Sequence, residues 1–312
     1  MLPFIFIIIG AVLLIKGADM LVDGGAGIAL KFGVSHLVVG LTVVAFGTSA
    51  PELAASLTAA FKDSGDICFG NVVGSNIANI ALVLGVTSFL GPVAVNRLLI
   101  KWEIPFLISI TALTWYIGLS RNVGHLIGAG FLILFGIYLF HCMKSPPVPI
   151  EVEEDKAGKR FLILFIMVVL GIVGLGFGGM LFVKGARDIA RMFRLSEAVI
   201  GLTVVALGTS LPELITSVIA SVKGHSDISL GNVVGSNIFN ILLVIGATAS
   251  IHPYSISPDR YLNTVGLPMM MGIAVLLLPF SMRGNRISRA EGALFFFLYI
   301  VYCVLAVVMA KG

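Results

Sequence analysis

Charged residues are scarce in this sequence. Only 12% of its 312 residues are Asp, Glu, Lys or Arg, whereas soluble domains average about 25%. Hydrophobic residues make up 58% of the chain and form long runs. So little charge cannot cover the surface of a soluble domain of this size. The composition therefore predicts an integral membrane protein.

Several chemical signatures are also missing. The three cysteines form no CxxC pair, and the five histidines show no HxxxH or HExxH spacing, so we expect neither a disulfide framework nor a zinc site. The segment GNVVGSN lacks the GK[ST] ending of a P-loop. No aspartate pair or Ser–His pair of an intramembrane protease lies within the apolar runs. These absences predict a protein that is not an enzyme and has no cofactor. A net charge of +4 is no argument for nucleic acid, because membrane topology explains it.

Apolar windows of about 20 residues are long enough to cross the hydrocarbon core of a bilayer. We predict ten membrane-spanning helices, and the even number places both termini on one side. The N-terminal run has no basic residue before it, so it is expected to be a first span and not a cleaved signal peptide. The predicted spans lie near 3–28, 35–60, 66–91, 98–118, 123–142, 161–191, 195–222, 227–251, 261–281 and 290–310.

The longest polar segment, residues 143–160, is rich in proline and mixed in charge. It predicts an exposed linker between two five-helix halves, 1–142 and 161–312. With the N-terminus outside, eleven Lys and Arg residues fall on the inner side and seven on the outer side. Because inner loops carry the excess of positive charge, both termini are expected outside. The short loops and the lack of a targeting signal favour a prokaryotic plasma membrane.

An internal repeat links the two halves. When residues 40–85 are shifted by 161 positions onto 201–246, thirty of the 46 positions are identical. The shared strings are GLTVVAxGTSxPEL and GNVVGSNIxNIxLV, and the polar residues match best. Because each half has an odd number of spans, the second copy enters the membrane from the opposite side. Inverted repeats of this kind are a transporter architecture, with the binding site near the midplane between the copies.

Each copy carries a proline and a glutamate inside an apolar span. Pro51 and Pro212 have no N–H, so each frees a backbone carbonyl and kinks or breaks its helix. An ionisable group at membrane depth is costly and marks a functional pathway, which singles out Glu52 and Glu213. If the copies pack as inverted repeats, both carboxylates face one cavity. A divalent cation between them would remove their mutual repulsion.

The second motif adds further oxygen atoms. Ser75 and Asn79 are four residues apart, as are Ser236 and Asn240, so each pair shares one helix face. Carboxylate, amide, hydroxyl and carbonyl oxygens are hard ligands that suit Ca²⁺, and they also suit Na⁺. The motifs therefore predict broken helices at the midplane that surround a site for these cations.

The two copies, GTSAPE with GNVVGSNIAN and GTSLPE with GNVVGSNIFN, resemble the two repeats of the cation/calcium exchanger superfamily. The sodium/calcium exchangers are the most similar branch, and the short central loop resembles that of prokaryotic members. The resemblance implies that Glu52 and Glu213 are the main ligands and that the first and sixth spans slide across a fixed core. It implies further oxygen ligands from the hydroxyls of Thr48, Ser49, Ser75, Thr209, Ser210 and Ser236, the amides of Asn79 and Asn240, and the carbonyls of Ala45 and Ala206.

These observations predict a secondary antiporter that exchanges Na⁺ for Ca²⁺ by alternating access and extrudes Ca²⁺ with the Na⁺ gradient. A Ca²⁺/H⁺ antiporter that uses the same two glutamates is the alternative, since two protons would neutralise the site equally well. A cation channel fits the paired inverted motifs less well. The expected partners are the two ions and the lipid bilayer, with no obligate protein partner and no nucleic acid. Asparagine at both 79 and 240 leaves the centre two formal charges, which argues against a requirement for K⁺.

Overall fold

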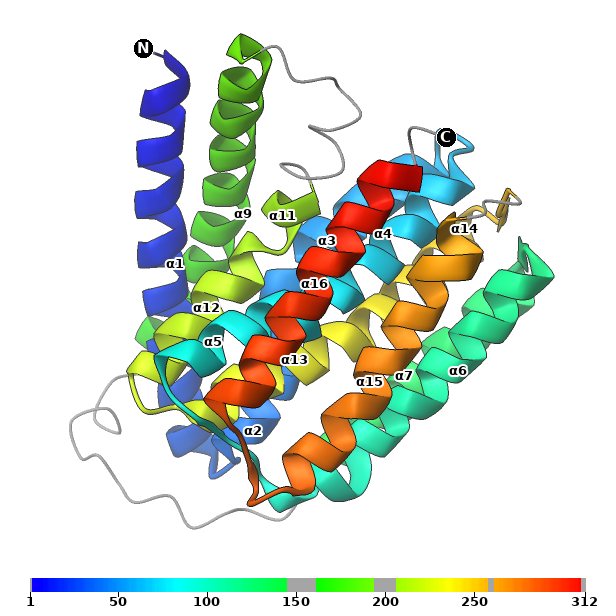
Figure 1. Cartoon of the computed structure of the whole chain (residues 1–312). Coiled ribbons are helices and arrows are strands. Elements are labelled where there is room, and N and C mark those ends of the chain that lie inside the picture. Colours follow the sequence, from blue (N-terminus) through cyan, green and yellow to red (C-terminus); the bar gives the residue numbers. More distant parts are fainter. Residues whose placement is uncertain (1, 145–160, 194–205, 258–260, 310–312) are drawn as a thin grey trace.

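Helices make up almost all of the structure, a computed structural model that describes residues 2–144, 161–193, 206–257 and 261–309. Figure 1 shows them as a bundle with α1 and α9 standing to one side. The α-helices are α1 (Leu2–Phe32), α2 (His36–Val39), α3 (Ala45–Ala60), α4 (Gly65–Ile77), α5 (Gly85–Leu90), α6 (Ile104–Ser120), α7 (His125–Lys144), α9 (Phe161–Met192), α11 (Ala206–Thr209), α12 (Leu211–Val222), α13 (Ser226–Phe239), α14 (Gly246–Ile251), α15 (Leu267–Met282) and α16 (Arg289–Met309).

Short π-helical segments continue several of these helices. They join α2 to α3, α4 to α5 and α13 to α14, so that each pair forms one continuous membrane-length helix. The wider π turn changes which face a side chain points to and is frequent at functional sites. The segments are Gly40–Val44, Ala78–Leu84, Leu99–Glu103, Asn240–Ile245 and Leu262–Gly266.

The predicted all-α membrane architecture is confirmed. Within the described residues, nine helices are long and apolar enough to cross a membrane, and their bounds agree closely with nine of the predicted spans. The predicted span 195–222 lies partly outside the described residues, and its described part consists of α11 and the shorter apolar helix α12. Most of the predicted linker 143–160 also lies outside them.

The most buried helices lie at the centre of the bundle. Within its most apolar window, the α13 span is 94% buried and the α4 span 78% buried, whereas α7 and α16 are each only 22% buried. These two central helices carry the GNVVGSN repeats. The polar repeat therefore lies inside the protein, while the purely apolar helices face lipid.

In the described part of the chain, four two-residue strands tie the helix ends together: β1 (Val93–Ala94), β2 (Asn122–Val123), β3 (Tyr254–Ser255) and β4 (Arg286–Ile287). β1 pairs with β4 and β2 with β3, both antiparallel. The single span α6 separates β1 from β2, so the two pairs lie on opposite faces of the membrane. Strand β3 is the sequence equivalent of β1 in the second half, 161 positions further along the chain, and it lies on the face opposite β1. This placement is consistent with the predicted inversion of the second half.

Helices α1 and α9 pack against each other in opposite directions along their whole length. Gly10 lies against Gly178 and Gly17 against Gly171, and a Cβ atom on any of these glycines would come within 3.0 Å of backbone atoms of the other helix. Small residues let two membrane helices approach this closely. Since 10 and 171, and likewise 17 and 178, are 161 positions apart, the contact is the same when viewed from either helix.

Among the described residues, the buried apolar side chains form two separate clusters. The larger one fills the space between α4, α6, α7 and α13 to α16. The smaller one joins α1 and α9 to Val39, Val44, Ala220 and Ile228. At one end of the smaller cluster, Lys223 Nζ lies 2.5 Å from Asp19 and 2.9 Å from Asp23. Helices α1 and α9 thus pack as a unit beside the main core.

Candidate functional site

The two copies of the GTSxPE motif adopt different backbone shapes. In the first copy α3 runs without interruption through Pro51. In the second copy the chain leaves the helix at Ser210, with φ −90° and ψ 5°, and Pro212 lies in the first turn of α12. The predicted break is therefore present in the second copy, whereas the first copy differs from the prediction. A proline removes only one helical hydrogen bond, and a membrane helix can continue past it where neighbouring groups compensate.

Glu52 and Glu213 come together from opposite halves of the chain. Neither residue is exposed to solvent (0% in each case), and they lie close enough for their charges to act on each other. Both carboxylate oxygens of Glu52, and Oε2 of Glu213, are buried without a hydrogen-bond partner among the described residues. Ser49 donates a hydrogen bond to Glu213 Oε1 over 3.4 Å. The two acids thus share one buried centre with carboxylate oxygens that accept no hydrogen bond from the described residues.

Thr48 connects the first copy of the motif to α13. Its hydroxyl lies 3.3 Å from the Ala45 carbonyl, 3.0 Å from Asn232 Oδ1 and 3.2 Å from Ser236 Oγ. Asn232 and Ser236 belong to the second half, so this network crosses between the halves. Three predicted ligands, Thr48, Ala45 and Ser236, are therefore in contact at one point.

Two asparagines that are not among the predicted ligands contact the backbone carbonyls of the two glutamates. Asn71 Nδ2 donates to Ser56 Oγ over 2.9 Å and lies 3.4 Å from the Glu52 carbonyl. Asn232 Nδ2 does the same to Ser217 Oγ over 3.0 Å and to the Glu213 carbonyl over 3.5 Å. All of these residues are identical between the two repeats, and that identity could have revealed them.

Asn79 and Asn240 lie at the starts of equivalent π-helical segments. Both are fully buried, and both the amide nitrogen and the amide oxygen of each lack a partner among the described residues. Between the two central helices, Asn76 Nδ2 donates to the Asn237 carbonyl over 3.3 Å. Because residues 76 and 237 are equivalent in the repeat, this contact lies where the two copies meet.

The remaining predicted ligands differ in how well the structure places them. Ser75 lies beside Glu52 and is 4% exposed. Ser210 is fully buried, and its hydroxyl has no partner among the described residues. Thr209 is half-buried and lines a cavity beside Pro51 and Pro212. Ala206 is the first residue of α11 and adjoins the undescribed residues 194–205.

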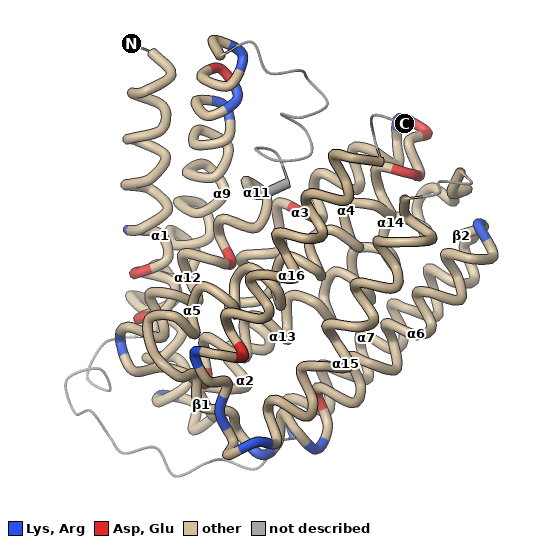
Figure 2. The backbone as a smooth tube through the Cα atoms, in the orientation of Figure 1, with Lys and Arg blue, Asp and Glu red and all other residues tan. Residues whose placement is uncertain are grey.

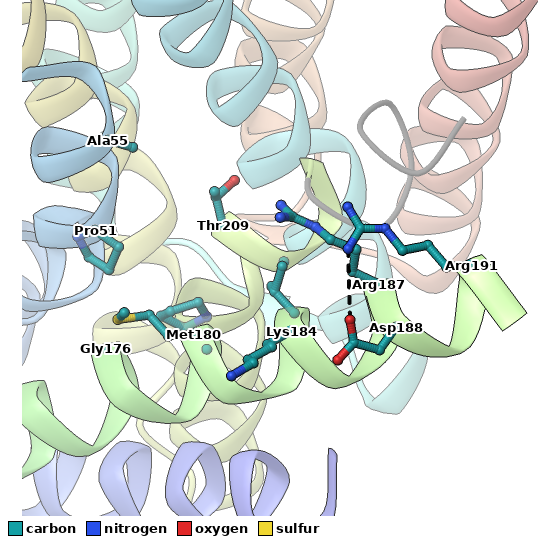
Figure 3. A pocket seen from close by; sticks show the side chains of 13 residues that line it. Pro51, Ala55, Gly176, Met180, Lys184, Arg187, Asp188, Arg191 and Thr209 are labelled. Atoms are coloured by element: carbon teal, nitrogen blue, oxygen red, sulfur yellow. Dashed lines mark ion pairs between the residues drawn. The ribbon is translucent and has the colours of Figure 1, made fainter. Parts of the chain in front are cut away.

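A cavity of about 560 Å³ leads toward the glutamates from the end of α9 that packs against the start of α1. Pro51, Pro212 and Thr209 line its inner part. Figure 3 shows Lys184 and Arg187 on the α9 wall, where Asp188 pairs with Arg191 at 3.9 Å. Glu52 and Glu213 follow Pro51 and Pro212 in the sequence and are not themselves among the residues that line the cavity.

The donor set of the centre consists of oxygen and amide groups. The described residues contain no group of three or more His, Cys, Asp or Glu side chains that could hold a metal ion. A tightly bound zinc or copper ion needs such a group, so these residues do not suit one. Buried carboxylates without partners are strongly disfavoured unless a cation or a proton neutralises them. Two acids surrounded by hydroxyl and amide oxygens therefore suit Ca²⁺ or Na⁺ as a transported ion.

Comparison with known proteins gives a consistent answer. The chain matches the family described as sodium/calcium exchanger protein over residues 2–144 and 163–308. It is 39% identical over 307 residues to the putative antiporter CaxA of Alkalimonas amylolytica, with 96% of each chain covered. It is 32% identical over 344 residues to the sodium/calcium exchanger MaX1 of Methanosarcina acetivorans, which covers 96% of this chain and 97% of that protein.

A solved structure resembles this one over nearly its whole length. The sodium-calcium exchanger NCX_Mj, soaked with 10 mM Na⁺ and zero Ca²⁺, superposes with a TM-score of 0.85 at 35% sequence identity. The match covers 97% of this chain and 98% of that one. At this identity and coverage, the shared architecture extends to both halves of the protein.

Proposed function

This chain belongs to the sodium/calcium exchanger family, and we propose that it exchanges Na⁺ for Ca²⁺ across a membrane by alternating access. The observation that carries the proposal is the meeting of Glu52 and Glu213 in one buried centre, with carboxylate oxygens that have no partner among the described residues. One Ca²⁺ neutralises both acids, and Na⁺ ions on the same oxygens can do so too. In the cell the Na⁺ gradient would drive Ca²⁺ out.

The two carboxylates also explain the coupling between the ions. An empty centre would hold two uncompensated charges in a medium of low dielectric constant, which costs several kcal/mol per ion. A protein in that state rarely changes the side to which it opens. Each change of access therefore needs a bound cation, and uptake of one ion is tied to release of the other.

We propose that residues 1–142 and 161–312 are the two halves, joined by the linker 143–160, and that α1 and α9 slide as a unit. The separate apolar clusters and the glycine contact between α1 and α9 support this division. The proposed ligands are Glu52 and Glu213 with the oxygen donors around them. They are Thr48, Ser49, Ser75, Thr209, Ser210, Ser236, Asn79, Asn240, Ala45 and Ala206.

The basic residues suggest an orientation in the membrane. In Figure 2 many of the Lys and Arg residues gather at the end of the bundle opposite the N-terminus. Because inner loops are positively charged, we propose that this end faces the cytoplasm of a prokaryotic cell. The cavity beside Pro51 then opens to the outside, since it lies at the end where α9 meets the start of α1.

Calcium uptake into proteoliposomes tests the function. One set of vesicles carries an outward Na⁺ gradient and another an outward H⁺ gradient, each with and without K⁺. We expect uptake with the Na⁺ gradient alone, abolished by a sodium ionophore and indifferent to K⁺. Protein-free vesicles are the control for leak.

Two results would contradict the proposal. Uptake that only the H⁺ gradient drives would make protonation of the two glutamates the coupling step. No driven uptake with either gradient would mean that the centre carries a different cation.

A further inference from the structure

At the inner end of the bundle, the end opposite the N-terminus, a lysine joins α1 to the turn between α12 and α13. Lys223 Nζ lies between two carboxylates of α1, 2.5 Å from Asp19 and 2.9 Å from Asp23. The lysine side chain is 27% exposed and those of the two acids 42% and 29%, so water screens these ion pairs only in part. Ala220 and Ile228, on either side of the turn, pack in the same apolar cluster as α1. The inner half of α1 is therefore closed against this turn by both apolar and ionic contacts.

The protein is open at the outer end. There the cavity of about 560 Å³ lies between α9 and α3, with Lys184 on one wall and Ala55 on the other. A shift of 161 positions takes Ala55 to Thr216 on α12, which is fully buried. The two halves thus differ as the two sides of an alternating-access carrier do, with the outer side open and the inner side closed.

The counterparts of Asp19 and Asp23 on α9 line the open cavity. Two registers relate α1 to α9, the shift of 161 positions and the match of LLIKGAD at 13–19 with LFVKGAR at 181–187. The counterparts are Met180 and Lys184 in the first register and Arg187 and Arg191 in the second, and all four line the cavity. If the inner side opens as the outer side does, the face of α1 that carries the two acids becomes a cavity wall. The acids must then move away from Lys223.

The outer side lacks the residues for the same ion pairs. Lys223 corresponds to Lys62, in the string KxxxDI that both halves share. In either register, the positions equivalent to the two acids carry neutral or basic side chains. Among the described residues that line the outer cavity, Asp188 is the one acid, and it already pairs with Arg191 at 3.9 Å. Closing the inner side therefore gains two ion pairs that closing the outer side does not.

We propose that Lys223, Asp19 and Asp23 form a latch that holds the inner side closed, so that the protein faces outward most of the time. This inference rests on the proposed alternating access and adds what sets the balance between its two states. Ca²⁺ from the cytoplasm can bind only while the latch is open. A site that is accessible for a fraction of the time binds with an apparent affinity reduced by that fraction. The latch therefore weakens Ca²⁺ binding from the inside, and export proceeds mainly when cytoplasmic Ca²⁺ is high.

Thiol labelling of the purified protein in lipid nanodiscs, which leave both sides accessible, tests the proposal. Thr216→Cys places a thiol at a fully buried position that is exposed when the inner cavity forms. Mass spectrometry of its peptide follows the labelling while the native cysteines stay in place, and saturating Ca²⁺ keeps the centre occupied. We expect Lys223→Gln to raise the initial labelling rate by roughly threefold to tenfold, which lies within the range that two partly exposed ion pairs supply. Lys223→Arg keeps the charge and should leave the rate close to that of the intact latch.

Two controls make the test specific. Lys101→Gln removes an exposed positive charge at the same end of the bundle without touching the acids, and it should not change the rate. Ser217→Cys places the thiol at a buried position of α12 whose hydroxyl accepts from Asn232. Because this thiol reports a general loosening of α12, it should not be labelled faster in Lys223→Gln.

Three results would overturn the proposal. The first is an equal labelling rate of Thr216→Cys with and without Lys223→Gln, and the second is a rise of the same size in either control. The third is no labelling of Thr216→Cys in any variant, because the inner cavity would then not open beside α12. Labelling needs no ion gradient, so its outcome is separate from that of the uptake test. A chain that carried a different cation would still show the latch, and a chain without the latch would still exchange Na⁺ for Ca²⁺.

Discussion

Ser49 donates its hydroxyl to Glu213 across the boundary between the two halves, over 3.4 Å. The acid of the second repeat is thus held by a hydroxyl of the first. Thr48 crosses the same boundary in its contacts with Asn232 and Ser236. A change in either half therefore alters the surroundings of both carboxylates, and neither repeat contains a complete site by itself.

Replacing either acid should stop calcium exchange. Glu52→Gln and Glu213→Gln each remove one of the two charges that balance Ca²⁺. Breaking a buried charge pair costs about 3–5 kcal/mol, which corresponds to a loss of affinity of more than roughly a hundredfold. Na⁺-driven Ca²⁺ uptake by proteoliposomes measures the effect. The matched control is Glu291→Gln, which changes a largely buried glutamate on α16 that accepts hydrogen bonds from Ser288. Coupled uptake that persists in either variant would show that the acid is not a ligand.

Asn232 should contribute more to the stability of the protein than its counterpart Asn71. Asn232 is fully buried and both accepts from Thr48 and donates to Ser217, whereas Asn71 is only half-buried. Asn232→Ala leaves two buried hydroxyls with fewer partners, so we expect a loss of about 1–3 kcal/mol in the free energy of unfolding. Asn71→Ala should lose less. Thermal unfolding of the two purified variants measures this order, and the reverse order would contradict it.

A larger side chain in place of a glycine at the contact between α1 and α9 should slow transport. A Cβ atom at Gly17 would lie 2.8 Å from the backbone nitrogen of Leu175 and 2.9 Å from the carbonyl oxygen of Gly171. Gly17→Ala must push the helices apart, and overpacking of this kind costs roughly 1–3 kcal/mol. We expect initial uptake rates to fall by about tenfold, which corresponds to a cost within this range.

The matched control for this change is Gly136→Ala on α7, where a Cβ atom meets nothing within 4 Å. It adds the same methyl group to an exposed position of a membrane helix. Equal rates in Gly17→Ala and Gly136→Ala would mean that the closeness of α1 and α9 does not matter for the transport cycle.

A third acid in the centre should change the ion requirement. Asn240 is fully buried, and Asn240→Asp would leave one negative charge uncompensated when Ca²⁺ is bound. A monovalent cation can supply the missing charge. Na⁺-driven uptake by the unchanged protein should therefore be indifferent to K⁺, whereas the variant should be slow without K⁺ and faster with it. A variant that behaves like the unchanged protein would place Asn240 outside the ion-binding centre.

The helices and the polar centre could largely be predicted from the sequence. The lipid environment constrains every residue of a span, so the predicted window 66–91 agrees closely with the observed Gly65–Leu90. The exact repeat of Glu52 as Glu213 marked the site because packing alone does not require a buried acid twice. Both inferences depend on residue type and spacing, which the sequence states directly.

Contacts between distant segments could not be predicted in the same way. The repeat shows which polar residues recur, but not that Thr48 meets Asn232 or that Asn71 supports the Glu52 carbonyl. The placement of Thr209 at a cavity wall, unlike its counterpart Thr48, depends on the backbone turn at Ser210. That turn is a property of the folded state, because the same motif forms an uninterrupted helix in α3.

The unequal shapes of the two motifs have a consequence for the transport cycle. GTSAPE and GTSLPE differ at one position, yet one is helical throughout and the other is bent at Ser210. Near-identical segments must have nearly the same intrinsic preference for either shape. If the halves traded shapes, the straight segment would bend at Ser49 and the bent one would straighten. The binding centre would then open to the other side of the membrane. The two states would differ little in local energy, because the two segments that exchange shapes are nearly identical in sequence.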